Sequence, residues 1–294
     1  MRCSRPGFAW ESMDINPSGK RSLVFSPRNA RPHSGREVPC GKCTPCKMNA
    51  SRDWAVRLYH EVLHSPVACV ATLTLDDNHL VERIEELRPV VKAFKMRLQR
   101  SGIDHRSHWL CEYGGKFDRA HCHAVFLNED FRNSKTYKLG ETSYGSELMD
   151  KLWQQGHVHL DIVSPSACRY VAGHNQSKIL APVRSDGGLT SYNIPARRPA
   201  IGMKFARQFA SDIINLNACV VGSSETAVPK SYKKNEPELF ASVIEHCKVF
   251  AANTAAVSLS SGFTDLQEKQ REYSARMRLI QATEVKAWHK GAHA

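Results

Sequence analysis

The chain has 294 residues, enough for one large domain or two small ones. Its 41 lysines and arginines outnumber 29 acidic residues and give a formal net charge of +12, which favours a polyanion such as nucleic acid as the partner. No apolar run approaches the ~20 residues of a membrane span, and the first residues lack the apolar core of a secretory signal, so we expect a cytoplasmic protein with no membrane partner.

The amino-terminal part of the chain is rich in arginine, serine, proline and glycine, and residues 1–39 show neither helical nor strand periodicity. We therefore expect a basic arm there. Cys40, Cys43 and Cys46 follow it in the string VPCGKCTPC. In a reducing compartment this spacing favours a metal over disulfides, and Cys3 is the candidate fourth ligand of a tetrahedral zinc site. A metal-free turn is the alternative, because no second CxxC follows at zinc-finger spacing.

The next part of the chain predicts a helix, a strand and a second helix. SRDWAVRLYHEVLH carries a helical stripe of apolar residues, with Ser51 as its N-cap. VACVATLTL, residues 67–75, is rich in β-branched residues and predicts a buried strand. LVERIEELRPVVKAFKMRLQRSG predicts a helix that Pro89 kinks or splits and that Gly102 ends.

Two strands come next, SHWLCEY and HCHAVFL, and the turn-rich GGKFDRA between them predicts a hairpin. A helix in SELMDKLWQQ, a third strand in GHVHLDIV and a helix in SPSACRYVAGHNQSK follow. RRPAIGMKFARQF and a long charged helix around LQEKQREYSARMRLIQATEVKAW complete the chain. This order predicts an α+β fold with a central antiparallel sheet flanked by helices. We divide it into a basic arm with the cysteine cluster (1–50), a central domain (51–205) and a mainly helical region (206–294).

The string CEYGGKFDRAHCHAVFL carries a metal-binding pattern. Residues two apart on a strand share a face, so His121 and His123 present two imidazoles to one divalent cation. Across a hairpin, Glu112 would add an oxygen ligand, and this donor set suits manganese or magnesium in phosphate chemistry. A second pair, His157 and His159, has no such carboxylate across a turn. An isolated His-x-His is also typical of polar residues on a half-buried strand, so spacing alone does not decide.

The string SACRYVAGHNQSK carries a candidate nucleophile. Tyr170, His174 and Lys178 are four residues apart, and a helix would stack them on one exposed polar face. A phenol with a pKa of about 10 needs a cation to assist its deprotonation, and Lys178 or a metal could supply it. A surface helix on which Tyr170 packs by its ring is the alternative.

Several strings together resemble the replication initiation proteins of microviruses, small single-stranded-DNA bacteriophages, and the gokushovirus-type branch in particular. The similar blocks follow the family's order along most of the chain: PCGKCTPCKMNASRDWAVRLYHE, ATLTLDD, CEYGGKFDRAHCHAVFL, ACRYVAGHNQSK, RRPAIG and KSYKKNEPELF. The resemblance implies an HUH endonuclease fold for the central domain. In that fold a His-x-His pair on a central strand holds a divalent ion, and a helix tyrosine attacks DNA.

The resemblance also implies roles for single residues. The positions that match the family's metal ligands are Glu112, His121 and His123. Tyr170 matches the nucleophile, and Lys178 would orient the phosphate or lower the phenol's pKa. The family often has a second tyrosine where this chain has His174, so we expect a single-tyrosine enzyme in which His174 carries a proton or binds the metal.

The function implied is that of a rolling-circle replication initiator, which nicks the origin, stays linked to the 5′ phosphate and religates. Its partners would be single-stranded DNA or a supercoiled phage origin, with a host helicase and polymerase, in the bacterial cytoplasm. Aromatic side chains, Trp109 or Phe117, would stack on unpaired bases. The basic residues expected to contact DNA are Arg119, Arg197, Arg198 and Lys204.

Two other functions stay open at this point. The first is a non-catalytic, zinc-containing DNA-binding regulator with structural histidines. Only the nuclease would leave Tyr170 covalently attached to DNA. The second is a transposase or plasmid relaxase of the same chemistry, although the order of the family blocks speaks against it.

Overall fold

The computed structural model describes residues 3–17, 19–114, 118–133, 136–140, 143–172, 191–196 and 198–249. Within them the strands are β1 (Gly7–Ile15), β2 (Arg21–Val24), β3 (Arg36–Val38), β4 (Ala68–Thr74), β5 (Arg106–Tyr113), β6 (Ala120–Leu127), β7 (Thr136–Lys138), β8 (Tyr144–Ser146), β9 (Val158–Asp161), β10 (Ser191–Ile194), β11 (Cys219–Val221) and β12 (Ser224–Thr226). The α-helices are α1 (Thr44–His64), α2 (Leu87–Arg100), α3 (Glu147–Trp153), α4 (Pro165–Val171), α6 (Met203–Gln208), α7 (Ala210–Leu216) and α8 (Lys230–Asn235). Short 3-10 turns are η1 (Pro27–Asn29), η2 (Asp77–His79), η3 (Ile84–Glu86) and η4 (Phe131–Asn133).

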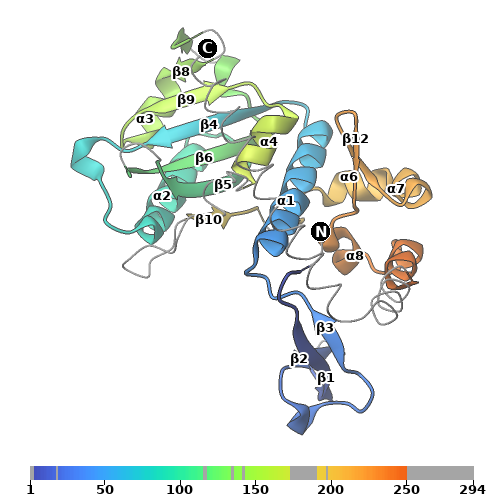
Figure 1. Ribbon diagram of the computed structural model, residues 1–294. Helices are drawn as coiled ribbons and strands as arrows, with labels where there is room; N and C mark the ends of the chain where they lie inside the picture. Colours follow the sequence, from blue (N-terminus) through green and yellow to red (C-terminus); the bar gives the residue numbers. More distant parts are fainter. Residues whose placement is uncertain are drawn as a thin grey trace.

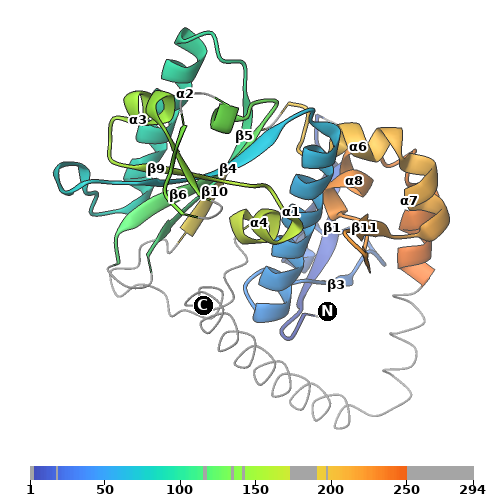
Figure 2. The same cartoon turned by 90° about the horizontal axis from the view of Figure 1, so that it is seen from above.

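The centre of the fold is a seven-stranded antiparallel sheet in the order β10-β5-β6-β4-β9-β8-β7 (Figure 1). Helices α2 and α3 cover one face, where Phe94 and Trp153 pack edge to face in the larger apolar core. Helices α1 and α4 cover part of the other face, where Leu58 and Val171 are buried (Figure 2). The predicted α+β class with a central antiparallel sheet flanked by helices is confirmed.

The hairpin of β5 and β6 has the register on which the metal-site prediction depends. Glu112 faces His121 across the two strands, and His123 lies two residues further along β6. Facing residues of an antiparallel pair point to the same side, so all three side chains lie on the face of α1 and α4. On the opposite face Cys111 meets Cys122, with their sulfur atoms 2.8 Å apart. These two cysteines, which are single in the sequence, are neighbours in the fold.

Helix α1 begins at Thr44, so the prediction of an N-cap at Ser51 is wrong. Cys43 is the N-cap, and Pro45 lies in the first turn, where its missing N–H removes no helical hydrogen bond. Ser51 is buried within the helix instead, and its hydroxyl donates to the Ala172 carbonyl at the end of α4, at 3.3 Å. The helix start thus coincides with the cysteine-rich turn.

The helix predicted around Pro89 is split as expected. The 3-10 turn η3 precedes α2, and Pro89 lies in the first turn of α2. Past the end of α2, Gly102 adopts a φ of +77°, which a residue with a side chain rarely adopts.

Residues 1–39 are not an irregular arm, because the described part of them forms a three-stranded antiparallel sheet in the order β2-β1-β3. This N-terminal sheet extends from the start of α1, away from the central sheet (Figure 1). Of its strand residues, Ala9 and Ser12 are buried, whereas Phe8 is 51% exposed. A strand shows alternating hydrophobicity only where one of its faces is buried, so the segment carries no periodic signal.

Helices α6, α7 and α8 pack against the side of α1 that faces away from α4, where Val56 is buried (Figure 2). Gly202 in the RRPAIG block has a φ of +81°, and its N–H donates to Glu61 of α1. A Cβ at Gly202 would overlap the Tyr232 hydroxyl, so the close packing requires glycine. The RRPAIG block is thus a structural contact with α1.

The domain division stays a prediction, and its limits after residues 50 and 205 fall within α1 and α6. The long charged helix predicted around residues 266–288 lies outside the described residues. Among the residues that are described, none of the helices combines the length and apolar character needed to cross a membrane.

Candidate metal and nucleophile site

The hairpin brings the three predicted metal ligands together. The Nε2 atoms of His121 and His123 are 3.0 Å apart, and each lies 3.6 Å from Oε1 of Glu112. Glu112 is only 2% exposed. A buried carboxylate that faces two imidazole nitrogens is a donor set that fits a divalent cation, and the three ligand atoms lie within 4.8 Å of one another.

In both histidine rings Nδ1, the nitrogen that does not face the ligand group, contacts a neighbouring oxygen atom. Nδ1 of His121 lies 3.2 Å from the Arg119 carbonyl, which can only accept, so Nδ1 carries the proton and Nε2 keeps its lone pair for a metal. Nδ1 of His123 lies 3.0 Å from the hydroxyl of Thr72 on β4. Thr72 was not predicted as part of the site, although it alternates with apolar residues along β4 and faces His123 in the register.

Tyr170 reaches this site from α4. The helix starts at a serine-proline pair as predicted, with the Ser164 hydroxyl accepting from the Ala167 N–H at 3.1 Å. The Tyr170 hydroxyl donates to Oε1 of Glu112 at 3.3 Å and lies 3.2 Å from Nε2 of His123. Tyr170 is therefore partly buried against the ligands, and the predicted exposed face is wrong at this residue. Burial, and then the Glu112 carboxylate, raise the pKa of the phenol.

The other two members of the predicted stripe, His174 and Lys178, lie outside the described residues. Helix α4 as described ends at Val171.

The second His-x-His pair shares a face with the first. His159 on β9 faces Thr72 on β4, which itself faces His123 on β6, so the two pairs flank β4 on the same side of the sheet. His157 and His159 are exposed. Among the described residues, only the first pair has a carboxylate that completes a ligand group.

The predicted DNA-contacting residues are spread over the molecule. Arg119 is exposed next to the ligands and pairs with Asp77 at 2.7 Å. Arg198 is exposed, and its carbonyl accepts from Arg106 at the start of β5, roughly 20 Å along the strand from Glu112. The remaining basic residues are Lys204, which is exposed on α6, and Arg197, which lies outside the described residues.

The predicted stacking role of Trp109 is wrong, because this side chain is fully buried between Phe94 and Phe126 in the larger core. On a strand buried on both faces, a tryptophan packs inside and is closed to a base. Phe117 lies outside the described residues.

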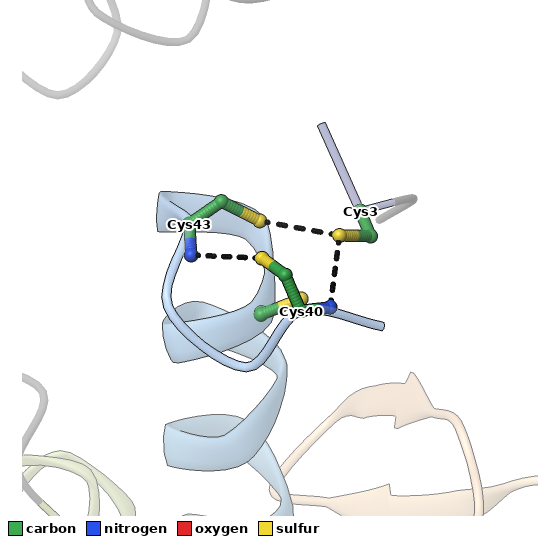
Figure 3. A group of neighbouring side chains, drawn as sticks. Cys3, Cys40 and Cys43 are labelled. Carbon is green, nitrogen blue, oxygen red and sulfur yellow. Dashed lines mark hydrogen bonds between the residues drawn. The ribbon is translucent and has the colours of Figure 1, made fainter. Parts of the chain in front are cut away.

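The predicted cysteine cluster forms a second candidate metal site. Four sulfur atoms, those of Cys3, Cys40, Cys43 and Cys46, lie within 4.8 Å of one another. Cys3 thus meets the other three at the start of α1 (Figure 3).

Comparisons with known proteins match the part of the chain that contains this site. The family of the replication-associated protein ORF2 matches residues 68–178, which include the three candidate ligands and Tyr170. The chain is 28% identical to replication-associated protein VP4 of Bdellovibrio phage phiMH2K, over 81% of this chain and 79% of that protein. The chain is thus similar to replication-associated proteins of phages, and this similarity supports a replication initiator of the microvirus type.

Two further replication-associated proteins are similar over shorter parts. Protein ORF2 of Spiroplasma virus 4 is 26% identical over 48% of both chains, and protein ORF4 of Chlamydia phage 1 is 24% identical over 67% of this chain and 52% of the relative. No solved structure is significantly similar to the chain. Similarity to phage replication-associated proteins supports a replication initiator role and suggests that the chain binds DNA.

Proposed function

We propose that this replication-associated protein is a rolling-circle initiator of the HUH type, which nicks one DNA strand with Tyr170. The observation that carries the proposal is that the Tyr170 hydroxyl lies within hydrogen-bond distance of two candidate metal ligands, Glu112 and His123. Manganese or magnesium held by Glu112, His121 and His123 would polarise the scissile phosphate. A nucleophile next to the metal ligands is the arrangement that phosphate transfer needs.

The residues of the chain would carry out the remaining steps. The Tyr170 phenol loses its proton, and its oxygen bonds to phosphorus while the bond to the 3′ oxygen breaks. A proton is returned to the 3′ oxygen, which leaves a 5′-phosphotyrosine and a free 3′ hydroxyl. Glu112 accepts the phenol's hydrogen bond and so orients the attacking oxygen. Because burial raises the pKa of the phenol, its deprotonation depends on positive charge at the site.

The product explains how one protein can start and end a replication cycle. The free 3′ hydroxyl primes synthesis by a host polymerase, with a host helicase opening the duplex. Reversal of the transfer religates the strand, because the phosphotyrosine bond conserves the energy of the phosphodiester. On the resemblance alone, we assign Lys178 to the phosphate and His174 to proton transfer.

We expect Tyr170→Phe to bind origin DNA but to form no covalent adduct, because the ring is kept while the nucleophilic oxygen is lost. Wild-type protein with Mn²⁺ should nick single-stranded or supercoiled origin DNA and migrate as an adduct in denaturing gels. Mass spectrometry of the DNA-linked peptide should identify Tyr170. Tyr137→Phe, at an exposed tyrosine on β7, is the matched control and should form the adduct like wild type.

An undiminished adduct in Tyr170→Phe, or a linked peptide from elsewhere in the chain, would show that another group is the nucleophile. Wild-type protein that binds origin DNA but forms no adduct with any divalent metal would favour the non-catalytic regulator.

A further inference from the structure

Four cysteines from two separate chain segments meet where the N-terminal sheet joins α1. The sulfur atoms of Cys3 and Cys43 are 3.6 Å apart and point toward each other (Figure 3). A disulfide would require about 2.05 Å. Zinc–sulfur bonds of about 2.3 Å in a tetrahedron place neighbouring sulfurs about 3.8 Å apart. The separation between Cys3 and Cys43 therefore matches the edge of a zinc tetrathiolate.

The chain is shaped locally to present these sulfurs. Gly41 adopts a φ of +72°, which turns the backbone sharply between Cys40 and Cys43. Cys43 is the N-cap of α1 but makes no side-chain capping bond, and Cys46 is buried in the first helical turn. The sulfur atoms of Cys40, Cys43 and Cys46 therefore lie close together, and Cys3 reaches them from a separate segment of the chain (Figure 3).

Backbone donors already point at two of the sulfurs. The Cys40 N–H donates to Sγ of Cys3, and the Cys43 N–H donates to Sγ of Cys40, each at 3.3 Å. Hydrogen bonds of this kind orient thiolate ligands and stabilise their negative charge in metal sites.

We propose that Cys3, Cys40, Cys43 and Cys46 bind one structural zinc ion that fastens the N-terminal sheet to α1. Cys3 precedes β1 and Cys40 follows β3, so the ligands bracket the whole sheet. The sheet has little core of its own, and small sheets of this kind need a staple for stability. Zinc would supply that staple, because the free energy of metal binding to the folded state adds to the free energy of folding.

The proposed zinc site has a different role from the candidate nicking site. Four protein thiolates close the coordination sphere and leave no position for substrate. Soft sulfur ligands favour zinc over magnesium and manganese, whereas Glu112 and the two histidines provide oxygen and nitrogen donors. The two sites therefore differ in metal preference and can be tested separately.

The test begins with the metal content of the full-length protein purified without chelator. We expect one zinc per chain by elemental analysis, and loss of that zinc in Cys40→Ser and Cys43→Ser. Cys247→Ser, at an exposed cysteine, is the matched control and should retain zinc. The double variant His121→Ala/His123→Ala should also retain it, which excludes the histidine site as the source.

A second measurement uses wild-type protein alone, so it does not depend on whether the cysteine variants fold. Replacing zinc by Co²⁺ should produce the absorption bands of a tetrahedral thiolate site. Removing the metal should expose residues 1–40 to limited proteolysis before the central sheet.

Three results would overturn the zinc proposal: wild-type protein without zinc, zinc retained in Cys43→Ser, or a mass that shows disulfides among the four cysteines. Zinc-free wild-type protein that still nicks DNA with Mn²⁺ would overturn this inference and leave the proposed function intact. Zinc-loaded protein that forms no DNA adduct would support this inference and contradict the proposed function.

Discussion

Thr72 shows how a residue outside the ligand set can control the candidate metal site. Its hydroxyl lies 3.0 Å from Nδ1 of His123, while Nε2 of the same ring faces Glu112 and Tyr170. Such a bond fixes the direction of the ring. Thr72 is therefore a positioning residue of the proposed site.

We expect Thr72→Val to weaken Mn²⁺ binding about tenfold while the fold is kept, because valine has the shape of threonine without the hydroxyl. The nicking rate measured against Mn²⁺ concentration should shift to higher concentrations and approach the wild-type rate at saturation. Thr74→Val is the matched control on the same strand, since the Thr74 hydroxyl donates to the His157 carbonyl. An unchanged Mn²⁺ dependence in Thr72→Val would exclude this role.

At the scale of elements, strand β4 separates the two His-x-His pairs on one face of the sheet. Neighbouring strands are about 4.8 Å apart, so β6 and β9 are separated by about 9.6 Å. Among the described residues, His157 and His159 do not join the group of ligand atoms formed by Glu112, His121 and His123. They are exposed on the same face of the sheet as that group.

We expect His121→Ala/His123→Ala to abolish nicking with little loss of stability, because two ligands disappear without opening a core cavity. His157→Ala/His159→Ala should keep the rate constant of nicking in single-turnover experiments but should bind origin DNA severalfold more weakly. Abolished nicking in the second variant, with activity kept in the first, would move the metal to β9.

At the scale of the whole molecule, helix α1 connects the cysteine cluster, the central sheet and the carboxy-terminal helices. His60 of α1 contacts the carboxy-terminal part of the chain. Its Nε2 donates to the Val220 carbonyl at 3.2 Å, so in the neutral ring Nδ1 accepts from the Tyr232 hydroxyl at 3.0 Å. Burial lowers the pKa of His60 to about 4, although the Val220 contact opposes the shift.

This burial predicts that the protein loses stability in mild acid. The pKa of His60 is lower in the folded state than its value of about 6.5 in the unfolded chain, so the unfolded chain binds more protons between these values. The contribution of His60 to the free energy of unfolding is fully present above about pH 6.5. It falls by up to about 1.4 kcal/mol per pH unit as the pH drops toward 4. The buried His108, whose pKa is lowered to about 3 chiefly by burial, adds to the same trend.

Urea denaturation at pH 7.5, 5.5 and 4.5 measures this effect as the free energy of unfolding. His60→Gln should show a shallower decrease than wild type over this range. His64→Gln, at an exposed position near the end of the same helix, should follow the wild-type curve. Equal slopes for wild type and His60→Gln would rule out His60 as a source of acid sensitivity.

The sequence by itself determined the hairpin, the candidate ligands on it and the class of the fold. Strand alternation places His121 and His123 on one side, and a turn-rich link places Glu112 opposite them, so these relations depend on residues close in the chain. The tertiary structure decided what depends on distant packing. Tyr170 meets Glu112 across a sequence separation of 58, and Cys3 meets Cys40 across 37. The N-terminal sheet was not predicted for a related reason, because strands with few buried residues on either face show no alternating pattern.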